Sequence, residues 1–297
     1  MSAGSLEALV TIQLIYLIAA LGHYLPLSMK QLDLGIAGYF AIGAYTSAFL
    51  TRDCGFSFAL ALIAGSVAAA AGAFVVDALA TRVRLTGFAY AIFSLSFAES
   101  LRVILNNVEA LGSSGGFVGI PSHTTFATVA VIAAAVLSGF WWLDRTRLGH
   151  LRTAIADDEF IVAIFGVPLT STKLTIFAIG GALGGLAGGL YSHYVLFIRP
   201  DDFGFALLIG LQLPMVFGGL DRFYGAVVGL LLLGFIPEFV RELAQYRLIV
   251  MAAATLLVLI LRPSGLITHQ TIAWSKDGFR RLIGIRVVPD AKPGPLS

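Results

Sequence analysis

The sequence predicts an all-α, polytopic membrane protein with about eight or nine transmembrane helices, some of them broken or short. Hydrophobic residues make up 58% of the 297 residues and charged residues only 12%, whereas a typical soluble domain carries about 25% charged residues. Apolar runs of roughly 20 residues, the length with which a helix crosses a bilayer, recur along the chain. Composition and run length therefore both indicate membrane-spanning helices.

The predicted spans are joined by short polar connections. In chain order we expect them at residues 9–27, 34–50, 56–80, 87–105, 125–143, 174–194, two short spans within 203–239, and 248–261. The segment 203–239 is ambiguous, because it can form one over-long span or two short spans broken at residues 217–223, Phe-Gly-Gly-Leu-Asp-Arg-Phe. The distribution of positive charge decides in favour of two.

Lysine and arginine near the ends of spans favour the cytoplasmic side of a membrane. With two short spans in 203–239, 14 of the 19 Lys and Arg residues share one side with the C-terminus, four lie opposite, and Arg102 lies within a span. We therefore predict nine crossings, an extracytoplasmic N-terminus and a cytoplasmic C-terminus. The chain divides into a transmembrane domain, residues 1–265, and a cytoplasmic basic tail, residues 266–297. The N-terminus has no positive region before its apolar run, so we expect a retained span and no cleaved signal peptide.

Two spans are rich in glycine. The span at 34–50 contains Gly35, Gly38 and Gly43, which permit either close helix packing or a locally broken helix near a transport path. The span at 174–194 contains two series of glycines four residues apart, namely Gly180, Gly184 and Gly188, and Gly181, Gly185 and Gly189. A glycine inside a soluble helix costs about 1 kcal/mol relative to alanine. Six glycines in one helix therefore predict close contact with neighbouring helices.

Glu99 and Arg102 stand three residues apart in the span at 87–105. At this spacing the two side chains share a helix face and can form an ion pair. Because both lie toward the end of the span, their long side chains can reach the membrane interface. An interfacial ion pair is therefore favoured, and a role in the translocation path is the alternative.

The longest polar interruption of the hydrophobic region runs from residue 144 to residue 173. Apolar residues recur at roughly helical spacing within it, which predicts a short amphipathic helix. Gly166 and Pro168 follow the last of these residues and are typical of a helix end. Such a helix can lie at the membrane surface and offer its polar face to a soluble partner, or it can be an ordinary solvated loop helix.

The sequence contains no pattern typical of an enzyme or a metal site. Its five histidines have no close ligand spacing, its single cysteine excludes a cysteine cluster, and neither G-x-S-x-G nor a phosphate-binding G-x-x-x-x-G-K-[ST] occurs. We expect no catalytic residues, no metal, no cofactor and no nucleic-acid partner. A secondary transporter coupled to an ion gradient is the competing class, but outside the ambiguous segment 203–239 only Asp77, Glu99 and Arg102 are charged residues within the spans. That scarcity favours a pore whose energy comes from elsewhere.

The order of several short motifs resembles the permease subunits of ABC importers for branched-chain amino acids, the LivM-like group. The resemblance covers residues 32–265 and rests on these segments: 34–46 (LGIAGYFAIGAYT), 115–121 (GGFVGIP), 148–159 (LGHLRTAIADDE) through Gly166, 187–194 (AGGLYSHY), 216–220 (VFGGL) and 262–265 (RPSG). Each motif is weak alone, but their joint order and spacing are specific. After Gly219 and Leu220 this chain has Asp221 and Arg222 where the family often has Gly-Ser or Gly-Thr.

The resemblance implies an inner-membrane permease that forms half of a translocation path in a bacterial cell. It implies four kinds of partner: a second, LivH-like permease, two cytoplasmic ABC ATPases that bind the ATP, an extracytoplasmic solute-binding protein, and membrane lipid. The family's ATPase-coupling loop falls on Ala154, Ala156, Asp157, Asp158, Glu159 and Gly166. The glycine-rich stretch 111–121 is uncharged and predicted to lie outside, so we expect it to meet the binding protein. Related importers carry leucine, urea, amides or aromatic acids, so the substrate stays open.

Overall fold

The computed structural model describes residues 3–239, 246–262 and 265–266. The predicted basic tail, 266–297, lies outside the described residues apart from its first residue. The elements in chain order are α1 (Ala3–Leu27), α2 (Ile36–Arg52), α3 (Phe58–Arg82), α4 (Gly87–Asn107), η1 (Glu109–Leu111), η2 (Ser113–Gly115), β1 (Phe117–Val118), α5 (Phe126–Leu143), α6 (Arg147–Asp157), α7 (Glu159–Ile164), α8 (Leu169–Val195), β2 (Phe197–Ile198), η3 (Pro200–Phe203), α9 (Phe205–Gly218), α10 (Phe223–Phe239) and α11 (Arg247–Leu261).

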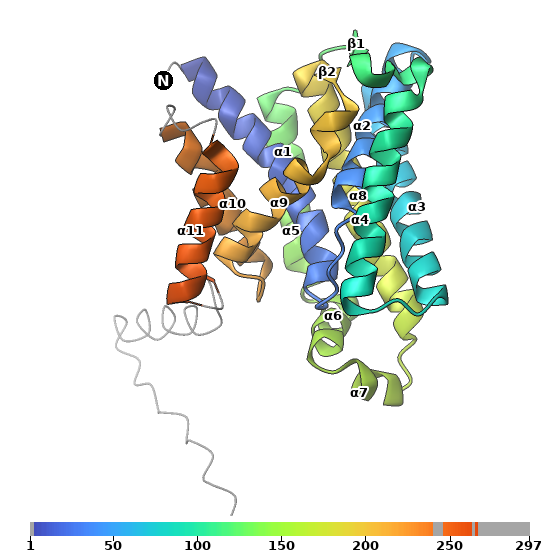
Figure 1. Ribbon diagram of the computed structural model, residues 1–297, viewed down its shortest axis with the longest axis vertical. Helices are drawn as coiled ribbons and strands as arrows, with labels where there is room; N and C mark the ends of the chain where they lie inside the picture. The colour runs from blue at the N-terminus through green and yellow to red at the C-terminus, as the bar shows by residue number, and fades with distance from the viewer. Residues whose placement is uncertain (1–2, 240–245, 263–264, 267–297) are drawn as a thin grey trace, which may run out of the picture.

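The long helices form one bundle, with α6 and α7 projecting from one end and the short strands β1 and β2 at the other (Figure 1). We call these the α6–α7 end and the β1–β2 end. The N-terminus lies at the β1–β2 end, and the turn between α3 and α4 lies at the α6–α7 end (Figure 1). The helix α8 packs against α1, α2 and α3, and α2 also packs directly against α3.

Six helical segments of the described chain are long and apolar enough to cross a membrane, which confirms the prediction of an all-α polytopic membrane protein. They are Gly4–Leu27, Phe58–Arg82, Gly87–Asn107, Phe126–Leu143, Leu169–Val195 and Pro200–Gly218. The predicted break within 203–239 is also present, because α9 ends at Gly218 and α10 begins at Phe223. Gly219 has a φ of +103°, a backbone conformation that favours glycine, and it ends α9.

The two glycine series of α8 face different neighbours, which explains why the helix needs both. The first series faces α1 and α2: a Cβ atom at Gly180 would stand 2.7 Å from the carbonyl oxygen of Gly22, and one at Gly184 would stand 2.8 Å from Ile36. The second series faces α3: a Cβ atom at Gly181 would stand 2.8 Å from the carbonyl oxygen of Ala69. The predicted close helix contact is therefore present on two sides of α8.

Three helices come into backbone contact at Gly43, Gly65 and Gly185, which we call the glycine node. A Cβ atom at Gly43 of α2 would overlap the backbone of Gly185, and one at Gly65 of α3 would stand 2.8 Å from the carbonyl oxygen of Gly43. A Cβ atom at Gly185 would in turn stand 2.9 Å from the carbonyl oxygen of Gly65. No residue larger than glycine fits any of these positions without moving a helix.

Gly38 and Gly189, two further glycines of the predicted packing set, also permit close approach of helices. A Cβ atom at Gly38 would stand 3.1 Å from the Cα atom of Ala98 in α4, so this position holds α2 close to α4. A Cβ atom at Gly189 would stand 2.7 Å from Leu62 in α3. Gly35 precedes the first residue of α2.

We expect Gly185→Leu to lower the thermal stability of the protein in detergent. Its side chain would enter the glycine node, and overpacking of a filled interior typically costs about 1–3 kcal/mol. The melting temperature, followed by size-exclusion chromatography after heating, measures the effect.

The matched control is Gly139→Leu, because Gly139 lies in α5 and a Cβ atom there would have no neighbour within 4 Å. Equal melting temperatures for the two variants would contradict close packing at the node.

Candidate functional site

The polar stretch expected to form one amphipathic helix forms two, α6 and α7. The break falls at Asp158, whose carboxylate oxygen Oδ1 accepts hydrogen bonds from the backbone N–H groups of Phe160 (2.9 Å) and Ile161 (3.0 Å). An aspartate that caps a helix start in this way ends the preceding helix and begins the next. The prediction of a single helix was therefore wrong at Asp158, whereas the predicted stop holds, since Gly166 follows α7 with a φ of +75°.

The helix α6 is fastened to the membrane helices by Arg152. Its side chain is only 3% exposed and donates from Nη2 to the Asp144 carboxylate at 2.7 Å. The guanidinium carbon also lies 5.1 Å from the ring centroid of Tyr24 in α1. One cation thus connects α6 to the end of α5 and to α1. Breaking such a buried pair costs more than breaking an exposed one, because the remaining charge is left without a partner.

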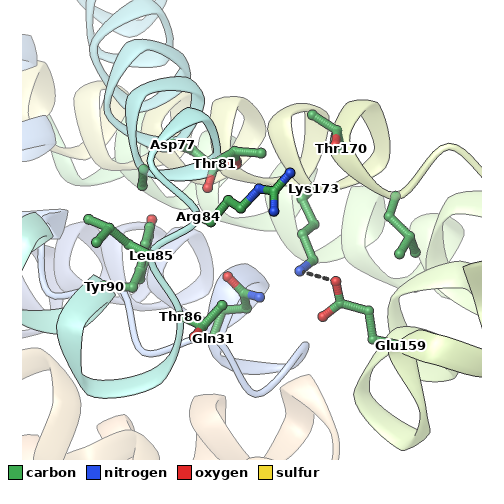
Figure 2. Close-up of a pocket in the computed structure, with 12 residues that line it drawn as sticks. Gln31, Asp77, Thr81, Arg84, Leu85, Thr86, Tyr90, Glu159, Thr170 and Lys173 are labelled. Atoms are coloured by element: carbon green, nitrogen blue, oxygen red, sulfur yellow. Dashed lines mark hydrogen bonds and ion pairs between the residues drawn. The ribbon is translucent and has the colours of Figure 1, made fainter.

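The helix α7 has a separate connection to α8. Lys173 Nζ lies 2.7 Å from Glu159 Oε1, so the first residue of α7 is paired with the first turns of α8 (Figure 2). Val162 is the buried apolar residue of α7. A displacement of α7 would therefore act on α8 through the ion pair, and it would also move a side chain that belongs to the apolar core.

Four large apolar side chains of the α7 region project away from the protein. They are Phe160, Ile161, Ile164 and Phe165, and we call them the α7 apolar face. Phe160 is 75% exposed and Phe165 is 81% exposed. A contiguous group of exposed aromatic and aliphatic side chains is typical of a protein or membrane interaction site.

The structure brings the residues of the predicted coupling loop together at the α6–α7 end (Figure 1). Ala154 and Ala156 are partly buried, and Asp157 is exposed. The carboxylates of Asp158 and Glu159 are already engaged, one in the cap and the other in the ion pair. The α7 apolar face was missed in the sequence, because the same periodicity of apolar residues is equally typical of a face buried on the membrane domain.

The segment before α2 enters the protein interior without helical structure. The backbone N–H of Leu34 donates to Ser94 Oγ at 2.9 Å, and that of Gly35 donates to Asp33 Oδ1 at 2.8 Å. These side chains satisfy the backbone groups that a helix would otherwise pair, as a nonhelical segment inside a membrane protein requires. Burial raises the pKa of the Asp33 carboxyl to about 6, and the hydrogen bond from Gly35 opposes this shift.

The predicted ion pair of Glu99 and Arg102 is present at the β1–β2 end. Arg102 Nε lies 2.8 Å from Glu99 Oε2, and its Nη1 lies 2.6 Å from Asp201 Oδ1. The second partner was not predicted, because Asp201 is far away in sequence and the close approach of η3 to α4 is a tertiary contact. The three side chains tie the end of α4 to the segment that precedes α9.

The glycine-rich stretch 111–121 is held at the same end by strand pairing with β2 and by contacts of Arg52. Phe117 pairs with Ile198, and Val118 with Phe197, in a two-stranded antiparallel sheet. Arg52 donates from Nη1 to the carbonyl oxygen of Val118 at 2.8 Å, and its guanidinium lies 3.6 Å from the ring centroid of Phe117. This stretch is therefore a defined surface of the β1–β2 end.

Within the described ranges, no group of three or more His, Cys, Asp or Glu side chains is placed to hold a metal ion.

The comparisons with known proteins agree on one family. The model of the family described as branched-chain amino acid transport system, permease component, matches residues 5–261. The high-affinity branched-chain amino acid transport system permease proteins LivM of Salmonella typhimurium and of Escherichia coli are each 30% identical to this chain, over 90% of it and 70% of their own length. The corresponding permease protein LivH of Salmonella typhimurium is 27% identical over 58% of this chain and 56% of its own. No solved structure matches the chain.

We expect Asp144→Asn to loosen α6, because it leaves the Arg152 guanidinium buried without a carboxylate. Breaking one partner of a buried pair costs about 3–5 kcal/mol, which corresponds to an increase of roughly 100-fold or more in the opening of α6. Hydrogen–deuterium exchange of the α6 amides measures this opening.

The control is Asp53→Asn, which breaks the partly exposed pair between Arg52 and Asp53 at the opposite end. Exposed pairs contribute about 0–1 kcal/mol, so exchange at the end of α2 should change little. Unchanged exchange in α6 of the Asp144→Asn variant would show that Arg152 does not hold the helix.

Proposed function

Because this chain belongs to the family of branched-chain amino acid transport system permease components, we propose that it forms half of the translocation path of an ABC importer. The solute is a branched-chain amino acid or a related small polar molecule. The observation that carries the proposal is the extent of the family match, which runs from residue 5 to residue 261 and so spans the whole bundle. In this proposal the chain is not an enzyme, and ATP is bound and hydrolysed by partner subunits.

The proposed complex contains a second permease, two ATPases and a solute-binding protein. The similarity of this chain to LivH as well as to LivM supports pairing with a second permease of the same family. The binding protein would dock at the β1–β2 end, where the stretch 111–121 is exposed at Val118 beside the exposed Phe197 of β2.

The proposed orientation places the α6–α7 end in the cytoplasm of a bacterial cell, in its inner membrane. The connections between α1 and α2 and between α3 and α4 lie at this end (Figure 1). Lys30 and Arg84 lie in these connections and Arg82 is the last residue of α3, and clustered positive charge favours the cytoplasmic side. Nine crossings result if the six long segments are joined by the shorter helices α2, α10 and α11. An odd number such as nine puts the two termini on opposite sides of the membrane, whereas an even number would put them on one side.

The ATPase would dock on the α7 apolar face, with Asp157 and the backbone of Ala154 and Ala156 at its edge. The helix α7 projects beyond the bundle (Figure 1). Its apolar face is exposed and is therefore accessible to a soluble partner. Gly166 would let the segment between α7 and α8 bend as the ATPases close and open. Movement of α7 would reach α8 through Lys173 and Glu159, and movement of α6 would reach α1 and α5 through Arg152. The path would then open alternately to the two sides.

Purification of the tagged protein from its native membrane in mild detergent tests the complex. We expect a P-loop ATPase and a second permease to co-purify, because both contacts are required in every transport cycle. Recovery of this chain alone, together with uptake that follows an ion gradient and not ATP, would overturn the proposal in favour of a secondary transporter.

We expect Phe165→Ser to reduce recovery of the ATPase by at least 10-fold, because loss of an aromatic hot-spot side chain costs about 2 kcal/mol or more at an interface, and about 1.4 kcal/mol corresponds to tenfold in affinity. Val83→Ser is the control, since Val83 is also highly exposed and lies at the same end but outside α6 and α7. Equal recovery of the ATPase with both variants would show that the α7 apolar face is not the docking site.

A further inference from the structure

A polar pocket lies at the α6–α7 end, between the end of α3, the start of α4, the start of α8 and α7 (Figure 2). Its volume is about 150 Å³, and it is partly open to solvent. A cavity of about this volume can hold a molecule of the size of benzene, which has as many non-hydrogen atoms as alanine. The pocket thus fits a small molecule and lets a longer side chain protrude.

The floor of the pocket carries two polar groups that lack partners. Asp77 and Tyr90 line the pocket and are each only 2% exposed. Asp77 Oδ2 and the Tyr90 hydroxyl oxygen have no hydrogen-bond partner among the described residues. Buried polar groups in proteins are nearly always paired, so a donor bound at the floor would complete the pairing of both oxygen atoms. An ammonium group supplies three N–H donors and a charge opposite to that of a carboxylate.

The mouth of the pocket carries an excess of positive charge. Lys173 is paired with Glu159, which offsets one cation. Arg84 is exposed and has no ion pair within the part of the chain that the structure describes, and its guanidinium is turned to the side of Lys173 (Figure 2). Its backbone has a φ of +58°, which is unfavourable for any residue other than glycine. A guanidinium group is well suited to bind a carboxylate through two parallel hydrogen bonds.

We propose that this pocket binds a free α-amino acid from the α6–α7 side, with its ammonium group at Asp77 and Tyr90 and its carboxylate at Arg84. The proposal rests on the proposed function and deepens it, because the transported solute would then bind after its release into the cytoplasm. A bound amino acid would lie beside the ion pair of Glu159 and Lys173 and hold α7 against α8. Accumulated product would therefore slow further import.

The test uses the complete transporter reconstituted in vesicles, with L-alanine or L-leucine enclosed on the α6–α7 side and ATP supplied to the ATPases. We expect the initial rate of uptake to fall as the enclosed amino acid increases. Arg84→Gln should raise the half-inhibitory concentration at least 10-fold, because it removes the charged partner of the carboxylate. Asp77→Asn should do the same through the ammonium group.

Two controls separate this site from a general effect of charge. Arg82→Gln removes a neighbouring exposed arginine that does not line the pocket, and it should leave inhibition unchanged. Enclosed propionate lacks the ammonium group and ethylamine lacks the carboxylate, so neither should inhibit. Inhibition by propionate equal to that by alanine would identify a simple anion site and overturn the proposal.

The outcomes for the pocket and for the transporter can be told apart. Uptake driven by ATP without inhibition, or inhibition that is equal in the Arg84→Gln and Arg82→Gln variants, overturns the pocket and leaves the proposed function intact. Absence of uptake driven by ATP overturns the proposed function. In that event the pocket is tested by itself, by binding of radiolabelled alanine to the purified full-length chain. Binding that is lost in Arg84→Gln supports the pocket, and binding that is absent or unchanged in Arg84→Gln overturns it.

Discussion

The architecture depends on the close approach of helix backbones along α8. Inside a bilayer, lipid tails compete with apolar side chains for every apolar surface, so helices gain from contact mainly where small residues let the backbones meet. The glycine node of Gly43, Gly65 and Gly185 provides this contact for α2, α3 and α8 at once, and Gly22 with Gly180 adds α1. The four helices can therefore move as one body more readily than they can move against one another.

This rigid group differs from the way in which α6 and α7 are held. Within the described residues no glycine series joins these two helices to the bundle. Their ion-pair links are Arg152 with Asp144, and Lys173 with Glu159, and one side chain of each helix, Ile155 and Val162, lies in the apolar core. Each link ends on a different part of the bundle, the first near α1 and α5 and the second on α8. A force applied to the exposed α7 apolar face would thus reach both α8, which belongs to this rigid group, and α5, which the glycine contacts do not include.

The sequence predicts the close packing of the bundle but not the ion pairs and caps that fix the polar segments to it. The spacing of Gly181, Gly185 and Gly189 predicts close packing because a four-residue repeat places glycines on one helix face, and the Gly-Gly at residues 218–219 predicts the break before α10. The sequence assigns Asp158 to the coupling loop but does not show that it caps a helix, since whether an aspartate caps a helix depends on the backbone conformation around it. Asp201 reaches Arg102 only through the folded chain. Sequence patterns report local geometry, whereas ion pairs between distant segments need the tertiary structure.

Lys173 and Glu159 line the pocket and also form the ion pair that connects α7 to α8. If an occupant of the pocket favours the arrangement in which α7 is paired with α8, then that arrangement must bind the occupant more tightly by the same factor. Docking of an ATPase on α7 would then change the affinity of the pocket, although the docking surface and the floor at Asp77 lie on different elements. The size of this coupling is bounded by the difference in free energy between the paired and unpaired arrangements. An ion pair whose acid is half exposed contributes little by itself, so the packing of Val162 against the bundle must supply much of that difference.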